Sequence, residues 1–208
     1  MVLFLSGCAS GGVTPLGDAL TGWATSDSSV AERAASLEYA SLSLDTGDRK
    51  GLVALGAVAG PATYWPTGNN GMLVLYHDGL QATAGLQQDL LETRYRSLDG
   101  AAGGASDFVP WQQDTPGNFR MERHWQGSDG LPNRLAARGS LTCGESQPRQ
   151  LPLGERQLQR CDMQLVWEDG QRTRSTLWRD AETLRLWAAD TTPWPGGPRI
   201  RWEVARGW

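Results

Sequence analysis

Apolar and polar residues alternate with a period of two along most of the chain after residue 37, which is typical of strands that bury one face. The stretch 118–126 is the clearest case. One face of it carries Phe119, Met121, Arg123 and Trp125, and the other carries Arg120, Glu122 and His124. The same reasoning predicts further strands at 38–45, 51–59, 72–77, 80–84, 162–168, 171–178, 183–188 and 199–206. The stretch 86–94 fits a helix or a strand.

Turn signals separate these runs. The dipeptide Asp-Gly occurs at 78–79, 99–100, 129–130 and 169–170, and between apolar runs it predicts tight hairpins. Gly and Pro residues predict loops at 144–156 and 190–198. Two short helices are predicted near the N-terminus, at 14–24 and 30–35. The fold class is therefore all-β, a single antiparallel domain with a short helical N-terminus.

Composition narrows the function. The 208 residues are 39% hydrophobic, which is enough to bury a core, and the net charge is -4. The 18 arginines and the single lysine are scattered along the sequence without forming a run, so we interpret them as codon bias. With no basic surplus to neutralise phosphates, nucleic acid is not expected as a partner.

The first eight residues resemble a bacterial lipobox. Leu5-Ser6-Gly7 places small residues before Cys8, the position at which a signal peptidase cuts and the thiol receives a lipid. The apolar segment ahead of it is shorter than a working signal requires. We therefore interpret residues 1–8 as a truncated signal that ends at a lipidated Cys8.

The residues after Cys8 predict a tether and then the folded domain. Residues 9–15 are small and flexible, as in a spacer, and residues 16–208 form the β domain. Ala9 stands where an inner-membrane retention signal would place Asp, which favours a periplasm-facing location on the outer membrane. Because no later apolar stretch reaches the ~20 residues of a spanning helix, the lipid is expected to be the only membrane attachment.

The two remaining cysteines are candidates for a disulfide. Cys143 and Cys161 can pair in an oxidising compartment, closing a loop of roughly 18 residues worth about 3 kcal/mol. The sequence leaves open whether they do. A zinc site is not expected, because no further Cys or His stands at ligand spacing.

Several segments resemble the YjbF/GfcB family of lipoproteins. Besides the lipobox Cys, the resemblance rests on 39–42, 52–56, Trp65, 72–80, 83–86, Leu90 and 175–180. It is firmest in residues 37–91. One departure is the turn after Asp180, which lacks a Gly that relatives often have.

This resemblance implies a strongly curved, barrel-like antiparallel meander sheet. It also implies a non-enzymatic accessory role in the export or assembly of an extracellular or capsular polysaccharide. The expected partners are the polysaccharide, an export barrel of the GfcD/YjbH kind and a periplasmic protein of the GfcC/YjbG kind. The resemblance carries over no catalytic residue, cofactor or metal.

Two alternatives remain open. A polysaccharide-modifying hydrolase or lyase would need paired carboxylates, and the candidates by proximity are Glu168 with Asp169 and Asp180 with Glu182. These pairs stand at predicted turns, where carboxylates usually bind local backbone. A small integral outer-membrane barrel is suggested by the alternating C-terminal strand with its terminal Trp208, but Arg206 interrupts its apolar face.

Tryptophans are the main candidates for sugar contacts, since the C–H face of a sugar stacks on indole. Trp65, Trp111 and Trp194 stand next to prolines in predicted loops and are the candidate glycan contacts. The same loop tryptophans could instead close the open end of a curved sheet. The tryptophans that follow strand or helix patterns are expected in the core: Trp23, Trp167, Trp178, Trp187 and Trp202.

Overall fold

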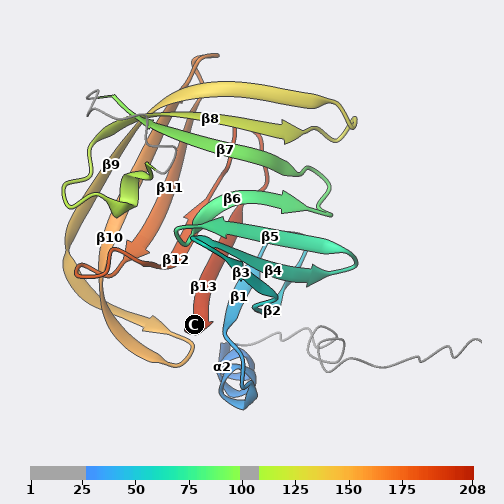
Figure 1. Cartoon of the computed structure of the whole chain (residues 1–208), viewed down its shortest axis with the longest axis vertical. Helices are drawn as coiled ribbons and strands as arrows, with labels where there is room; N and C mark the ends of the chain where they lie inside the picture. Colours follow the sequence, from blue (N-terminus) through green and yellow to red (C-terminus); the bar gives the residue numbers. More distant parts are fainter. Residues whose placement is uncertain (1–26, 99–107) are drawn as a thin grey trace, which may run out of the picture.

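The computed structural model describes residues 27–98 and 108–208, and it consists of antiparallel strands with one short α-helix (Figure 1). The predicted all-β class is confirmed. The helix α2 spans Asp27–Ser36, and η1 is a 3-10 turn at Pro110–Gln112. The strands are β1 Ser41–Asp45, β2 Lys50–Ala54, β3 Ala57–Ala59, β4 Ala62–Gly68, β5 Gly71–Tyr76, β6 Gly79–Ala84, β7 Leu90–Ser97, β8 Asn118–Gln126, β9 Pro132–Leu151, β10 Gly154–Trp167, β11 Arg172–Arg179, β12 Leu186–Thr191 and β13 Ile200–Arg206.

The strands divide between two sheets rather than the single sheet expected. The large sheet has nine strands in the order β2-β1-β13-β12-β11-β10-β9-β8-β7, and the small sheet has four in the order β3-β4-β5-β6. The large sheet curves around the core but stays open, with β2 and β7 at its edges. The small sheet lies against both of these edges, as Figure 1 shows.

Side chains bridge the two sheets where ladder hydrogen bonds are absent. Gln81 Nε2 donates to the carbonyl of Thr93 at 3.0 Å, and the amide of Leu90 donates to Thr83 Oγ1 at 2.9 Å. The predicted strand 51–59 is split by this arrangement, since its first half joins the large sheet and its second half the small one. The change of sheet occurs at Gly56, where a Cβ would lie 2.8 Å from the Pro66 ring.

The core lies on the concave face of the large sheet. Period-two alternation decides which residues face it, and the predicted inner face of 118–126 is confirmed: Phe119, Met121, Arg123 and Trp125 are buried. Arg123 is an unusual member of this set. Its guanidinium donates to the carbonyl of Pro193 and to Thr93 Oγ1, and burial lowers its pKa.

The hairpin predicted at Asp78-Gly79 is confirmed, although its turn lies one residue earlier. His77 and Asp78 have φ values of 46° and 65°, and Tyr76 pairs with Gly79. Gly79 is then needed for a different reason, because the indole of Trp111 lies against its Cα. A Cβ at this position would be 2.1 Å from the Trp111 ring.

The predicted loop at 144–156 is wrong. These residues belong to a long hairpin in which β9 and β10 continue beyond the rest of the sheet. β11 pairs with β10 only from Gln159 onward, so residues 144–158 form a two-stranded ribbon, which we call the arm. Pro148 is tolerated there because a two-stranded ribbon leaves one side of each strand without ladder partners.

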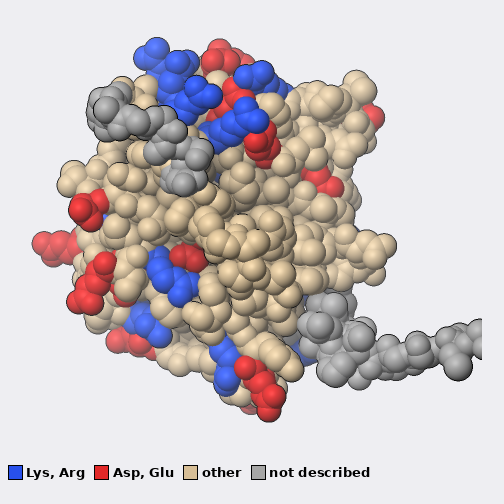
Figure 2. All heavy atoms as spheres, in the orientation of Figure 1, with Lys and Arg blue, Asp and Glu red and all other residues tan. Residues whose placement is uncertain are grey.

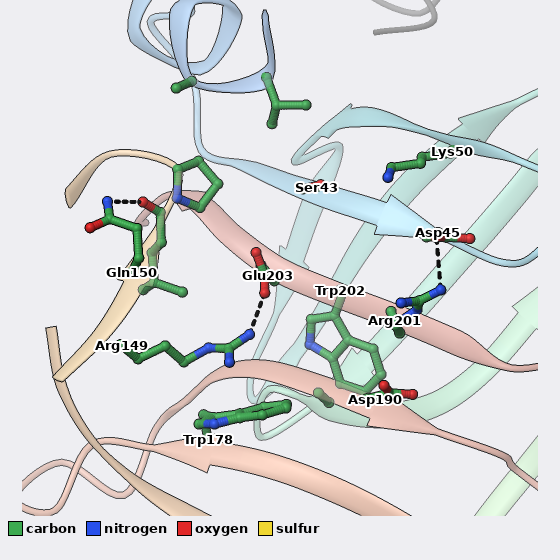
Figure 3. Close-up of a pocket in the computed structure, with 15 residues that line it drawn as sticks. Ser43, Asp45, Lys50, Arg149, Gln150, Trp178, Asp190, Arg201, Trp202 and Glu203 are labelled. Carbon is green, nitrogen blue, oxygen red and sulfur yellow. Dashed lines mark hydrogen bonds and ion pairs between the residues drawn. The ribbon is translucent and has the colours of Figure 1, made fainter. Parts of the chain in front are cut away.

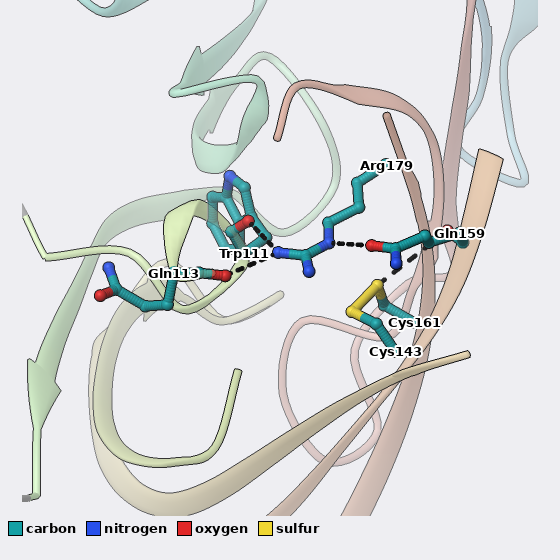
Figure 4. Close-up of a disulfide and its surroundings, with 6 residues drawn as sticks. All are labelled: Trp111, Gln113, Cys143, Gln159, Cys161 and Arg179. Atoms are coloured by element: carbon teal, nitrogen blue, oxygen red, sulfur yellow. Dashed lines mark hydrogen bonds between the residues drawn. A yellow bond between two sulfur atoms is a disulfide. The ribbon is translucent and has the colours of Figure 1, made fainter. Parts of the chain in front are cut away.

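A disulfide and a buried arginine hold the base of the arm (Figure 4). Cys143 and Cys161 pair in register on β9 and β10 and are joined by a disulfide. Beside it, Arg179 Nε donates to Gln159 Oε1, and its NH1 donates to the carbonyls of Trp111 and Gln113, all at 2.8 Å. Burial lowers the pKa of Arg179.

Helix α2 packs on the opposite, convex face of the large sheet. Val30 and Ala34 of the helix form a small second cluster with Leu52 of β2 and Ala205 of β13. The helix predicted at 30–35 is thus confirmed. Cys8, the tether, the helix at 14–24, Trp23 and the turn at 99–100 lie outside the described residues.

We expect Gly79→Ala to lower the free energy of unfolding by about 1–3 kcal/mol, because the added methyl must displace the buried Trp111 ring. Urea denaturation followed by circular dichroism measures this. The matched control is Gly117→Ala, since no atom lies within 4 Å of a Cβ there. Equal stability of the two variants would contradict the close packing.

We expect the double variant Cys143→Ser, Cys161→Ser to lose roughly 3 kcal/mol of unfolding free energy, since the disulfide closes a loop across a sequence separation of 18. Urea denaturation with and without reductant measures the loss. The native chain with reductant should match the variant without it. If the native chain were insensitive to reductant and only as stable as the variant, the disulfide would contribute nothing to the free energy of unfolding.

Candidate functional site: a polar groove on the convex face

The three candidate glycan contacts are buried, and the expectation that they are exposed is wrong. Trp65 is 0% exposed, and Trp111 and Trp194 are each 2% exposed. Trp65 lies in strand β4 of the small sheet rather than in a loop, whereas Trp111 and Trp194 lie in connecting segments, and all three indoles pack into the core. This is the alternative that the sequence left open for loop tryptophans.

Each of the three indoles has a fixed place in the core. Trp65 Nε1 donates to Thr63 Oγ1 at 2.9 Å, and Trp111 Nε1 donates to the carbonyl of His77 at 2.6 Å. Trp194 stacks on Trp125, with ring centroids 5.2 Å apart. Buried indole N–H groups normally require such partners. These side chains are therefore engaged in packing.

The carboxylates of the enzyme alternative serve local turns. Asp180 Oδ1 accepts hydrogen bonds from the amide of Thr183 at 2.8 Å and from that of Glu182 at 3.0 Å. The bond from the Thr183 amide is the main reason that the pKa of Asp180 lies below its ordinary value. Asp169 caps the preceding hairpin, between β10 and β11, by accepting from the amide of Gln171 at 2.9 Å. Neither pair lines the polar groove of the large sheet.

That groove lies on the convex face of the large sheet, between helix α2 and the arm (Figure 3). Its volume is about 550 Å³. Strands β1, β13, β12 and β11 form its floor, α2 forms one wall and the arm forms the other. The side chains that matter for its chemistry are Ser43, Asp45, Lys50, Arg149, Trp178, Asp190, Arg201 and Glu203.

The floor consists of two neighbouring cross-strand rows. In the first, Ser43 pairs with Glu203, which pairs with Ala188, and Ala188 pairs with Trp178. In the second, Lys50 pairs with Asp45, Asp45 with Arg201, and Arg201 with Asp190. Residues opposite each other on antiparallel strands share a face, so all of these side chains point out of the convex side.

Arg149 shapes the wall that the arm contributes. Its guanidinium lies 3.7 Å from the centroid of the Trp178 ring and forms an ion pair with Glu203. Figure 3 shows the side chain reaching from the arm across Trp178 toward Glu203. A cation over an indole face is attracted by the ring quadrupole. The contact therefore links the arm to β11 and β13 across the groove.

The charges of the groove alternate in sign. Arg201 NH2 lies 3.3 Å from Asp45 Oδ2, and Arg199 Nε donates to Asp190 Oδ1 at 2.7 Å. The amine of Lys50 has no partner in the part of the chain that the structure describes. The side chains of Asp45 and Asp190 are each about a quarter exposed to solvent. Free lone pairs of their carboxylates therefore remain accessible. An arrangement of this kind can hydrogen-bond a ligand that carries many hydroxyls.

Sequence reasoning missed this site for two reasons. Trp178 was assigned to the core, yet it shares the parity of Arg172, Arg174 and Thr176 along β11 and therefore lies on the convex face. The sequence predicts a loop around Arg149, because Gly and Pro surround it. The alternation of side chains within 172–179 was the signal available for Trp178, because it groups this residue with the polar face of the strand. No comparable signal exists for Arg149.

No protein-family model and no curated protein matches the sequence. The structure is similar to the crystal structure of the hypothetical lipoprotein YmcC from Escherichia coli K12, with a TM-score of 0.73 and 14% sequence identity. The similarity covers 86% of this chain and 89% of that one. At this identity the likeness shows a shared fold.

Proposed function

We propose that this protein is a periplasm-facing outer-membrane lipoprotein of the YjbF/GfcB kind, anchored through Cys8. It acts as a non-enzymatic accessory factor in the export or assembly of an extracellular or capsular polysaccharide. Two observations support the setting: the lipobox-like residues 5–8 and the fold shared with a protein described as a hypothetical lipoprotein. In the described residues, no helix is long and apolar enough to span a membrane.

The groove is the observation that carries the binding role. A polysaccharide presents hydroxyls in every direction, and the groove offers carboxylate acceptors and guanidinium donors along two rows. Hydrogen bonds to charged groups are the stronger class, at about 1.5–3 kcal/mol each. The groove is also open along the sheet, which suits a chain that enters and leaves rather than a small molecule that is enclosed.

The groove can hold a glycan while the rest of the surface contacts the export apparatus. Expected partners are a barrel of the GfcD/YjbH kind in the outer membrane and a periplasmic protein of the GfcC/YjbG kind. A lipid on Cys8 would keep the domain beside such a barrel. In this arrangement the protein guides or retains polymer and makes no covalent change to it.

The test uses the full chain carrying Cys8→Ser, which prevents lipidation, and the exopolysaccharide of the source bacterium. Isothermal titration calorimetry should show saturable binding. The variant Asp45→Asn, Glu203→Gln keeps the size of both side chains and removes two charged acceptors from the groove. We expect its affinity to fall about 10-fold or more.

The matched control is Glu145→Gln, Glu155→Gln, which removes the same charge from exposed positions of the arm outside the groove. Its affinity should equal that of the native chain. The proposed function would be overturned if the native chain bound no polymer. Equal losses in both variants would show that the groove is not where the polymer binds.

A further inference from the structure

Three arginines that are far apart in sequence form one row on the convex face of the large sheet. Arg96 of β7 pairs with Arg120 of β8, and Arg120 pairs with Arg138 of β9. All three side chains are exposed. Neighbouring strands lie about 4.8 Å apart, so the row presents three positive charges at that spacing. We call these residues the arginine row.

Among the described residues, no carboxylate pairs with the arginine row, whereas neighbouring arginines have such partners. Arg94 Nε lies 2.7 Å from Glu92 Oε1, and Arg134 NH2 lies 2.5 Å from Glu122 Oε2. The hydrogen bond from Arg134 is the main reason that the pKa of Glu122 is lowered. By contrast, no side-chain hydrogen bond or ion pair joins Arg96, Arg120 or Arg138 to any residue in 27–98 or 108–208.

Like charges directly opposite each other on antiparallel strands destabilise a sheet. A row of three such residues without acidic partners is therefore costly unless an anion lies across it. Guanidinium groups suit this role because their planar N–H donors bind carboxylate oxygens in pairs. The repulsion and the missing partners both point to a ligand that carries negative charge.

A shallow hollow adjoins two members of the row, Arg96 and Arg120, but not Arg138. It has a volume of about 280 Å³, and Arg94, Arg96, Arg120 and Arg134 line it together with Glu122 and Glu168. The two glutamates limit where an anion can lie, and they direct it toward Arg96 and Arg120. Figure 2 shows basic side chains gathered over the strands β7–β9 at the top of the view, with acidic ones beside them.

The position of the row distinguishes between two kinds of polyanion. Helix α2, through which the chain connects to Cys8, lies at the opposite end of the molecule from β7 and β8 (Figure 1). The described domain therefore begins at the end remote from the arginine row. A soluble polymer fits this geometry better than the headgroups of the membrane.

We propose that the arginine row binds the carboxylate groups of an acidic polysaccharide, one built from uronic acid or similarly charged sugars. The inference rests on the proposed function and specifies its substrate class. Carboxylates recur along such a polymer, so one chain can neutralise several arginines at once. Each polymer carboxylate that an arginine neutralises releases counterions condensed on the polymer, and the binding depends on salt accordingly.

The experiment titrates the full chain carrying Cys8→Ser with polygalacturonate, using neutral dextran of equal length as the comparison. The variant Arg96→Gln, Arg120→Gln removes two members of the row. At about 50 mM NaCl we expect its affinity for polygalacturonate to fall roughly 10-fold or more, and the slope of log K against log salt to flatten by about one per arginine removed.

The matched control is Arg156→Gln, Arg160→Gln, which removes the same charge from two exposed arginines of β10 that line neither the groove nor the hollow. It should bind polygalacturonate as the native chain does. Equal losses in the two variants, or equal binding of dextran, would overturn the proposal. So would row-dependent binding to vesicles of anionic phospholipid in the absence of polygalacturonate binding, which would make the membrane the partner.

This outcome is separable from the test of the groove. If the native chain binds the polymer of the source bacterium but the row variant binds polygalacturonate normally, the arginine row fails and the proposed function stands. If the native chain binds polygalacturonate through the row but not its own polymer, the proposed function fails instead.

Discussion

The register of the nine-stranded sheet governs every other feature of this molecule. Because side chains alternate strictly between the two faces of a strand, a slip of one residue would exchange the faces completely. On β13, Trp202 and Val204 enter the core while Arg201 and Glu203 line the groove. The same alternation on β8 buries Phe119 and leaves Arg120 in the arginine row. Core, groove and row are consequences of one pairing pattern.

A curved and open sheet leaves a wide concave face that its own side chains do not fill. Here large aromatic residues from loops and from the small sheet occupy that space. Trp65, Trp111 and Trp194 are all buried, and each has either a partner for its indole N–H or a stacked ring. Two buried arginines, Arg123 and Arg179, hold the loops in place through backbone carbonyls. The loops thus belong to the core as much as the strands do.

The local sequence pattern predicted the strands but not the contacts between residues that are distant in sequence. The alternation in 118–126 and the helix near residue 30 could be predicted, because each depends on neighbouring residues. The arm could not, since Pro148 and the glycines near it are equally typical of a loop. The burial of Trp111 depends on contact with Gly79, and the arginine row depends on strand pairings that join position 96 to 120 and position 120 to 138. Such contacts are set by the tertiary fold.

Because of where the disulfide lies, completion of the groove depends on the redox state of the compartment in which the protein folds. Cys143 and Cys161 lie at the base of the arm, and the arm supplies the wall that carries Arg149. In a reducing compartment the two cysteines remain thiols, and the backbone ladder, Arg179 and the contacts of Arg149 with Trp178 and Glu203 then hold the ribbon. A chain that has not yet reached an oxidising compartment therefore has a groove with an unsecured wall. Oxidation of the two cysteines would then be the last step in assembling the groove.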